Sequence, residues 1–477
     1  MRALYSRASA VVSASLWLFG CQVPLNMRPD SGVSVDSGVD DDASLVDDMA
    51  AAMEAGPNPN APLDYVPEGC THRVRTTPMT RVNYFGDTST FGPRATPRAV
   101  HVSWAADPSS TIAFLWNTDR ETRASVVQFG TAPTTLDRTA IGHVSTAGTG
   151  EGSVTTHEVH LCGLQPDTTY YYRVGGEGHF SAVQSFKTAP PAGAASYDVN
   201  FVVSGDSRNG YATLRMLQDR IMSVSGARQP DFQVFSGDAV FLGTSQAEWE
   251  EWFVSCAAPL ANMPFMIAHG NHDALSLNYL VQFAQPQAGM MEQDELYFSY
   301  DYGPMHFVVL NDTPFRGDLA GSVAGNQLTW LRQDLTRARA NRARVPWIVV
   351  VHHKPAFSSA RYADATDTVF LRQTWAPVFD EFGVDIVFNG HDHEFEVSKE
   401  IDGQGREVSG RRGTIYMISA GAGAELYPVG SQPWRRYSES VANFLLVHAT
   451  KTNFEVTPYR IDGTVINEGR VSLTPRS

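Results

Sequence analysis

The chain has 477 residues, which is too long for one ordinary domain and suggests two or three. Hydrophobic residues make up 43% of it and charged residues 18%, so packed cores are expected and global disorder is excluded. The formal net charge of −15 argues against a nucleic-acid partner, and four cysteines are too few for a disulfide-stapled scaffold or a Cys-rich zinc module.

Residues 1–21 have the pattern of an export signal. Arg2 and Arg7 precede an apolar stretch over residues 8–19, and Cys21 ends the segment. This arrangement is similar to a bacterial lipoprotein signal, which implies lipidation of Cys21; a simple cleaved signal or a misplaced start is the alternative. No apolar run reaches the roughly 18 residues that span a bilayer. We therefore expect an exported protein, either a cell-envelope lipoprotein anchored through Cys21 or a periplasmic or extracellular one.

Residues 22–67 have the composition of an acidic, disordered linker. Nine acidic residues stand against Arg28 alone, and few large apolar side chains are present. Prolines that block regular structure include Pro57, Pro59, Pro62 and Pro67. The segment is either a spacer that holds the globular part off the membrane or disorder without a role.

Residues 68–192 are predicted to form a small all-β sandwich. Short runs of β-branched and aromatic residues alternate with Gly and Pro, which is typical of antiparallel strands. The expected strands cover residues 100–104, 112–116, 125–129 and 169–174. The segments 164–170 and 185–190 resemble the corresponding parts of fibronectin-type-III-like domains.

The histidines of this segment that the strands contain or adjoin share no metal-ligand spacing with any other signal. We expect five of its histidines to be surface or turn residues: His101, His143, His157, His160 and His179. Cys70 and Cys162 could pair in an exported protein and tie the end of the linker to the sandwich, although sequence alone does not fix the pairing.

Residues 196–472 contain five apolar runs that each end in small polar residues. Runs of this kind are typical of strands buried on both faces, and ligands in layered α/β proteins gather beyond the carboxyl ends of strands. An amphipathic helix is expected over residues 326–338, capped by Asn326. The clusters that follow the five runs are Gly205-Asp206-Ser207-Arg208, Gly237-Asp238, His269-Gly270-Asn271-His272-Asp273, His352-His353 and Asn389-Gly390-His391-Asp392-His393.

These clusters predict a metal site. Asp, Asn and His supply oxygen and nitrogen ligands without a thiolate, which suits Zn, Mn or Fe. Two ions placed about 3.5–4 Å apart need a shared carboxylate and open positions for water and substrate. The combination of Gly270-Asn271-His272-Asp273 with Gly390-His391-Asp392-His393, each after a strand, is far more specific than any single Gly-Asp pair.

With these motifs, the chain resembles the calcineurin-like metallophosphoesterases and, among them, the purple acid phosphatase branch with its amino-terminal fibronectin-like domain. The resemblance covers about residues 95–470 and implies a sandwich followed by an α/β domain layered α-β-β-α. It also implies hydrolysis of phosphate esters by a metal-held hydroxide. The implied ligands are Asp206 and His393 on the first ion, Asp238 bridging both ions, and Asn271, His353 and His391 on the second.

The same resemblance assigns His272 as the group that faces the substrate and protonates the leaving oxygen. Asp273 is expected to orient His272, although a plain turn residue would look the same. His352 and His269 are interpreted as packing residues or supports of the ligands, and His306 as part of a core strand.

Two positions depart from the family pattern. The metal-binding Tyr of the purple enzymes is replaced by Phe241, and the His that other members place two residues after the first Asp is replaced by Arg208. The first ion is therefore expected to be loosely held, unless a residue such as Asn209 helps. Arg208 could instead clamp a phosphate oxygen, and a structural Arg is an equal alternative.

The sequence thus favours an exported dinuclear phosphoesterase that acts on small phosphomonoesters. A phosphodiesterase and a catalytically weak metal-binding scaffold of the same fold remain alternatives. A surface adhesion module is disfavoured by the intact motifs, and the loop at residues 361–364 does not identify the substrate. The oligomeric state stays open.

Overall fold

The computed structural model describes residues 61–77, 83–147, 153–194, 197–226, 229–274, 276–287, 295–313 and 323–476. The predicted signal at residues 1–21, with Cys21, and the linker as far as residue 60 lie outside the described residues. Everything described belongs to one unit that spans Pro57–Ser477.

The first described strands begin inside the segment predicted to be linker. β1 (Asp64–Tyr65) pairs antiparallel with β2 (Val74–Arg75), so regular structure starts before residue 68. Cys70, between these strands, forms a disulfide with Cys162. The pairing that sequence left open is therefore present, and it joins this hairpin to the strand that ends at residue 161.

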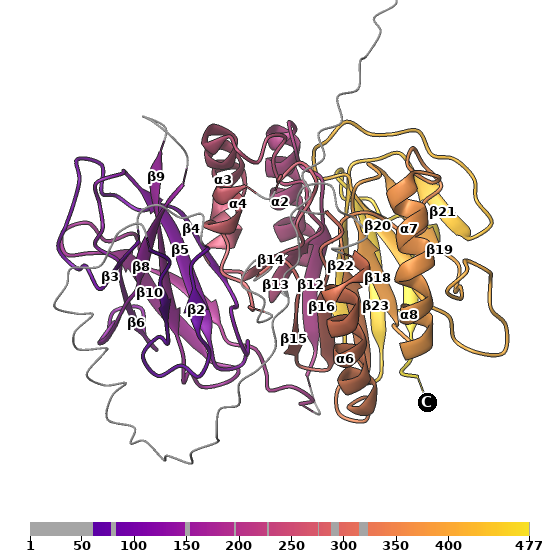
Figure 1. Cartoon of the computed structure of the whole chain (residues 1–477), viewed down its shortest axis with the longest axis horizontal. Helices are drawn as coiled ribbons and strands as arrows, with labels where there is room; N and C mark the ends of the chain where they lie inside the picture. The colour runs from indigo at the N-terminus through magenta and orange to yellow at the C-terminus, as the bar shows by residue number, and fades with distance from the viewer. Residues whose placement is uncertain are drawn as a thin grey trace, which may run out of the picture. The chain divides into compact units, whose positions relative to one another are not determined.

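Two antiparallel sheets form the predicted sandwich (Figure 1). One sheet has the order β3 (Tyr84–Phe85), β8 (His143–Ala147), β9 (Val154–Leu161), β5 (Ile112–Thr118) and β4 (Arg98–Ser103). The other has the order β11 (Gln184–Lys187), β10 (Thr169–Gly175), β6 (Val126–Gly130) and β7 (Arg138–Ile141). Aromatic side chains such as Phe114, Tyr172 and Phe186 pack together between the sheets, as alternating strands require.

The expectation for the sandwich histidines is wrong for four of the five. His101, His143, His157 and His160 are buried, and only His179 is exposed. His157 stacks on Trp116 with ring centroids 4.7 Å apart, and His101 bonds backbone carbonyls through both ring nitrogens. An imidazole can be buried at little cost when its ring nitrogens have hydrogen-bond partners. These four histidines are buried because they lie on strands of the sandwich.

Two mixed sheets form the core of the second domain. The six-stranded sheet has the order β14 (Phe265–Ile267), β13 (Phe232–Phe235), β12 (Val199–Ser204), β22 (Asn443–Ala449), β23 (Phe454–Arg460) and β24 (Val471–Leu473). The seven-stranded sheet has the order β15 (Phe298–Tyr302), β16 (Met305–Val309), β17 (Trp347–Val351), β18 (Ile386–Asn389), β20 (Ile415–Ser419), β19 (Phe395–Ser398) and β21 (Arg435–Glu439). Strands β12 to β14 run parallel, as do β16, β17, β18 and β20.

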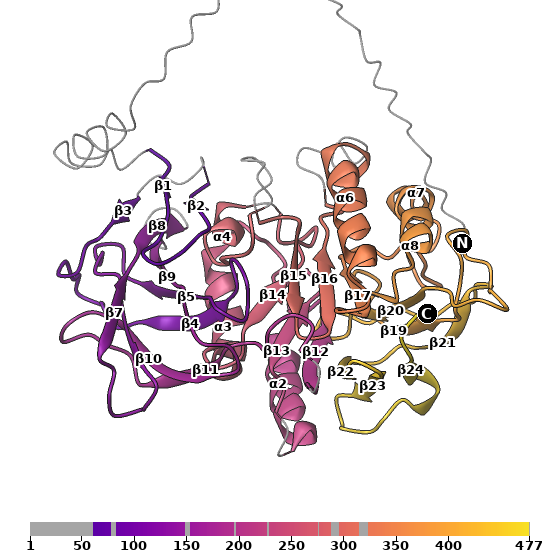
Figure 2. The ribbon, with the colours of Figure 1, turned by 90° about the horizontal axis from the view of Figure 1, so that it is seen from below.

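Helices cover the outer face of each sheet, which confirms the predicted α-β-β-α layering. One group packs on the six-stranded sheet and consists of α2 (Tyr211–Ser225), α3 (Gln246–Leu260) and α4 (Leu277–Leu280). The other packs on the seven-stranded sheet and consists of α6 (Asn326–Ala340), α7 (Thr366–Thr374) and α8 (Ala376–Phe382). Figure 2 shows α2 on one side of the two sheets and α6, α7 and α8 on the other.

The helix predicted at residues 326–338 is present, but its start differs in detail. Leu331 and Leu335 are buried as expected. Asn326 is the first helical residue rather than the cap, and Gly325 takes the cap position without a side-chain hydrogen bond. None of the helices in the described part of the chain is long and apolar enough to cross a membrane.

The sandwich and the α/β domain share one apolar core. Trp104, just after β4, is fully buried against Phe232, Tyr300 and Tyr302 of the second domain, with ring centroids 5.4–5.9 Å apart. The Tyr172 hydroxyl also donates to the carbonyl of Ala261 at 2.5 Å. The two predicted domains are thus fused through buried side chains.

Candidate metal centre and active site

The carboxyl ends of five parallel strands from both sheets carry the predicted site residues. β12, β13 and β14 lead into the loops with Asp206, Asp238 and Asn271. β17 and β18 of the other sheet lead into the loops with His353 and His391. Strand β20 follows the same pattern and ends at a Gly-Ala-Gly segment. Parallel strands end at the same edge of a sheet, and the two edges adjoin here.

Asp206 connects the two sheets. Both of its carboxylate oxygens accept a hydrogen bond from the backbone N–H of His391, at 3.0 and 2.9 Å. The His393 Nε2 lies 3.5 Å from Asp206 Oδ1. A side chain at Gly390 would overlap the Asp206 carboxylate, so this approach requires glycine.

Asp238 lies at the centre of the site and is fully buried. Its Oδ1 accepts the backbone N–H of His272 at 2.8 Å and lies 3.3 Å from His353 Nε2. Its Oδ2 accepts no hydrogen bond from the described residues and faces Arg208 Nε at 3.4 Å. Asp206, Asp238 and His391 all have positive φ, at 61°, 54° and 69°. Backbone strain of this kind is common where function fixes the position of a side chain.

One group of donors converges around His353. Its Nδ1 bonds the backbone carbonyl of Ser236 at 2.8 Å, which points Nε2 into the site. The Asn271 Oδ1 is 3.1 Å from that Nε2, and the His391 ring lies with its centroid 5.0 Å from the His353 ring. A histidine held by a carbonyl at one nitrogen and free to ligate at the other is the usual arrangement in metal sites.

A second group surrounds His393. Its Nδ1 bonds the carbonyl of Glu425 at 2.6 Å, so its Nε2 also faces inward. The Arg208 Nη2 lies 3.1 Å from that Nε2 and donates to the Tyr427 hydroxyl at 3.2 Å. The position between His393 and Asp238 is therefore taken by a guanidinium group.

Asp273 contacts backbone rather than the His272 ring. Its carboxylate accepts N–H groups of Asp238, Ala239 and Gly270 at 2.9–3.0 Å. Burial, reinforced by the charge of Asp238, raises its pKa to about 7. Asp273 was expected to orient His272. Its carboxylate instead ties the loop after β13 to the loop after β14, because a buried carboxylate needs several donors.

The His272 ring is oriented by the loop that contains Phe241. Its Nδ1 lies 2.8 Å from the carbonyl oxygen of Phe241, and the two rings pack with centroids 4.9 Å apart. The ring is partly exposed, in contrast to His353. His272 is thus the more accessible of these two histidines, and its backbone N–H bonds the carboxylate of Asp238.

The three remaining histidines near these motifs contact other partners. His352 is fully buried and pairs with Asp312 at 2.9 Å, and His269 is fully buried against Tyr279. His306, on β16, lies between Asp301 and Asp334 at 2.7 and 2.8 Å.

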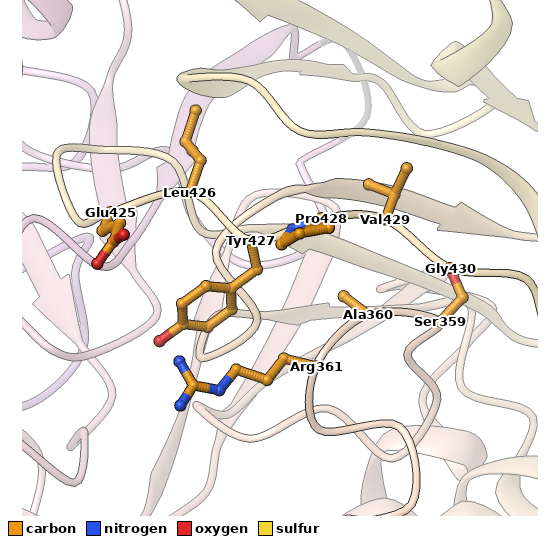
Figure 3. A pocket seen from close by; sticks show the side chains of 9 residues that line it. All are labelled: Ser359, Ala360, Arg361, Glu425, Leu426, Tyr427, Pro428, Val429 and Gly430. Carbon is orange, nitrogen blue, oxygen red and sulfur yellow. The ribbon is translucent and has the colours of Figure 1, made fainter. Parts of the chain in front are cut away.

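Sequence reasoning missed the aromatic wall of the site. Tyr362 stacks on His391 and Tyr427 on His393, with ring centroids 4.4 and 4.2 Å apart. Beside them lies an open pocket of about 420 Å³ lined by Arg361, Tyr427 and neighbouring residues (Figure 3). Arg361 and Tyr427 point toward one another there. The glycines after β20 follow a buried strand, as they do in the predicted clusters. This pattern was the one sequence feature that pointed to the loop with Tyr427.

The charges favour a cation at the centre. Burial opposes ionisation of Asp238, yet His353 and hydrogen bonds hold its pKa below the usual range. Burial alone would lower the pKa of His353, but the carboxylates of Asp238 and Asp206 raise it to about 10. Burial and the charge of His353 lower the pKa of His391 well below its usual value. The carboxylates therefore attract positive charge to His353 Nε2.

The donor set fits a metal ion. Asp206, Asp238 and His353 are buried and offer ligand atoms within 4.8 Å of one another. Together with Asn271 and His391, they supply the carboxylate, amide and imidazole ligands that suit Zn, Mn or Fe.

Comparisons with known proteins agree with this geometry. Residues 97–188 match the purple acid phosphatase N-terminal domain and residues 199–395 the calcineurin-like phosphoesterase domain. The chain is 31% identical over 327 residues to purple acid phosphatase 21 of Arabidopsis thaliana, which covers 65% of this chain and 68% of that protein. It is 26% identical to acid phosphatase type 7 of Homo sapiens, covering 72% and 82%. A purple acid phosphatase from yellow lupin (Lupinus luteus) seeds shares the fold, with a TM-score of 0.65 at 18% identity over 80% of this chain and 75% of that one.

Proposed function

The chain belongs to the purple acid phosphatase family of calcineurin-like phosphoesterases, and we propose that it hydrolyses phosphomonoesters at the site around Asp238. The observation that carries the proposal is the convergence of Asp206, Asp238 and His353 from two sheets, with the partly exposed His272 bonded to Asp238 through its backbone N–H.

When bound, a metal ion supplies a water of lowered pKa and neutralises phosphate oxygens. Asp238, Asn271, His353 and His391 would hold the ion. Ser236 and Asp273 fix this arrangement through backbone contacts, so little reorganisation is needed during the reaction.

His272 supplies the proton to the leaving oxygen. Its Nδ1 is held by the Phe241 carbonyl, which leaves Nε2 to face the substrate. Since phosphoryl transfer depends on positioning and charge stabilisation, a fixed and partly exposed imidazole suits the general acid.

Arg361 and Tyr427 offer a place for the ester group. Arg361 lies over the Tyr427 ring at 4.9 Å and over the Tyr362 ring at 5.3 Å, beside the ligand His393. A cation in an open pocket attracts the doubly charged phosphate of a monoester more strongly than the singly charged phosphate of a diester, and the aromatic faces suit a small ester group.

The proposal includes export from the cytoplasm. The disulfide between Cys70 and Cys162 would persist in an oxidising compartment, and the pattern of residues 1–21 supports the same location. A lipid anchor at Cys21 is the further expectation.

The test is phosphate release from para-nitrophenyl phosphate and bis(para-nitrophenyl) phosphate by metal-depleted protein resupplied with Zn, Mn or Fe. We expect metal-dependent turnover that is faster on the monoester. Asp238→Asn should lose metal and turnover together, while Asp462→Asn, which changes an exposed carboxylate in a distant turn, should retain both.

Each alternative has its own result. Faster turnover of the diester would favour a diesterase. Bound metal without turnover of either ester would favour a scaffold, and wild-type rates from Asp238→Asn would refute the site itself.

A further inference from the structure

Arg208 occupies the position between two of the ligands assigned to the first metal ion. Its Nη2 is 3.1 Å from His393 Nε2, and its Nε is 3.4 Å from Asp238 Oδ2. Only 15% of the side chain is exposed. A metal ion bound by His393 and Asp238 together would need the space that this guanidinium fills.

The backbone around Arg208 is fixed. Its N–H and that of Ser207 donate to the carbonyl of Asp238, at 3.3 and 3.1 Å. The Ser207 hydroxyl donates to the carbonyl of Ala239 and accepts from the indole of Trp252. The side chain is thus delivered to the site by a rigid loop, as the ligands are.

The side chain of Arg208 also has matched partners. Tyr427 accepts a hydrogen bond from Nη2, and the Phe241 ring lies 5.9 Å from the guanidinium carbon. Phe241 offers a ring face but no donor atom for a metal. Arg208 and Phe241, which both depart from the family pattern, therefore lie together. Their surroundings suit a guanidinium group rather than a metal ion.

We propose that the Arg208 guanidinium replaces the first metal ion, so that the chain holds one catalytic ion, on the side of Asn271, His353 and His391. The inference rests on the proposed function. The two negative charges of the buried carboxylates Asp206 and Asp238 are then more than offset by a permanent cation and one divalent ion, without a second ion. A second divalent ion would lie in contact with the guanidinium, and like charges at that distance repel strongly.

The replacement has a chemical consequence. Arginine stays charged at every working pH and presents several N–H donors in a plane, which match phosphate oxygens. Arg208 would stabilise charge on the phosphate from the side where other members of the family place an ion. Asp206 would then serve to hold the His391 loop, because both of its carboxylate oxygens accept the one backbone N–H of His391.

The test is metal stoichiometry. Protein loaded with excess Mn(II) and desalted should contain about one ion per chain by elemental analysis, with the EPR signal of an isolated Mn(II). Arg208→His, which exchanges the cation for a nitrogen ligand, should raise the content to two and give an exchange-coupled signal. Arg208→Ala should raise the metal content above one ion per chain. This variant replaces Arg208→His in the test if the His variant folds poorly.

Arg361→Gln is the matched control, because it removes a nearby guanidinium that lies over the Tyr362 and Tyr427 rings rather than between ligand side chains. Its metal content should equal that of the wild type. Two tightly bound ions in the wild type, or one ion in both Arg208 variants, would overturn the inference while leaving a phosphatase intact. Absence of both metal and turnover would instead overturn the proposed function.

Discussion

At the residue scale, neighbouring histidines of this site differ in what their rings contact. His353 is fully buried and its Nε2 is directed at Asp238, whereas His272 is partly exposed and held by the Phe241 carbonyl. The first arrangement suits a ligand, and the second suits a proton donor that must reach the substrate.

His272→Ala should therefore retain metal and slow turnover. We expect kcat to fall by about 10²–10⁴-fold, the usual contribution of a general acid, and the loss to be smaller for esters with acidic leaving groups. Steady-state kinetics on a series of aryl phosphates, together with elemental analysis, measure both effects.

His179→Ala is the control, since that ring is exposed on the sandwich. A His272→Ala protein that lost its metal would show that this ring supports the ligands instead. An unchanged kcat on esters with poor leaving groups would remove its role as the acid.

Sequence placed the predicted ligand residues better than it placed the groups around them. Asp206, Asp238, Asn271, His353, His391 and His393 lie together because each follows a recognisable buried strand. Asp273 was expected to hold a side chain but holds backbone N–H groups, a choice that depends on how two loops cross. Tyr362 and Tyr427 lie in loops whose course the strand pattern does not determine, although the glycines after β20 mark where the loop of Tyr427 begins.

At the element scale, the central strands could be predicted and the edges could not. Runs such as residues 347–351 are apolar throughout because both faces are buried, and the structure has a strand at the same residues. Short strands such as β1 and β3 have two residues each. β3 pairs with the distant β8, and the Cys70–Cys162 disulfide ties the β1–β2 hairpin to the residue after β9. Their existence is decided by tertiary contacts rather than by composition.

The packing of β16 on α6 predicts a dependence of stability on pH. Burial alone would lower the pKa of His306, but hydrogen bonds to Asp301 and Asp334 raise it to about 9. A histidine whose pKa is raised on folding stabilises the fold fully below its unfolded pKa of about 6.5, and that contribution is lost as the pH rises through about 9.

His306→Gln should therefore lower the free energy of unfolding by on the order of 2–3 kcal/mol near pH 6 and by much less near pH 10. Urea unfolding at both pH values measures the difference. His448→Gln, at a third-exposed position 3.8 Å from Asp198, should have little effect at either pH. An equal loss at both pH values for His306→Gln would show that the imidazole acts by packing alone.

At the scale of the whole molecule, length suggested separate domains, whereas the structure shows a shared core. Trp104 of the sandwich is fully buried among rings of the α/β domain, and Ser103 donates to the carbonyl of Ala284 at 2.6 Å. The sequence places Trp104 at the end of a strand but does not show which domain covers it.

The fused core predicts one cooperative unfolding transition for the sandwich and the α/β domain. Trp104→Ala should lower the free energy of unfolding by about 3–5 kcal/mol, the usual cost of truncating a buried aromatic, and should shift the whole transition. Differential scanning calorimetry with the disulfide intact measures it. Two separate transitions, or a shift in only one of them, would show that the domains unfold independently.

The central claim is that loops from two sheets assemble a metal centre, and its most direct test is anomalous diffraction from crystals grown with Mn(II). We predict a peak within coordination distance, about 2.0–2.3 Å, of donor atoms of Asp238, Asn271, His353 and His391. Absence of a peak at these side chains, in crystals of protein that releases phosphate in the presence of Mn(II), would contradict the account.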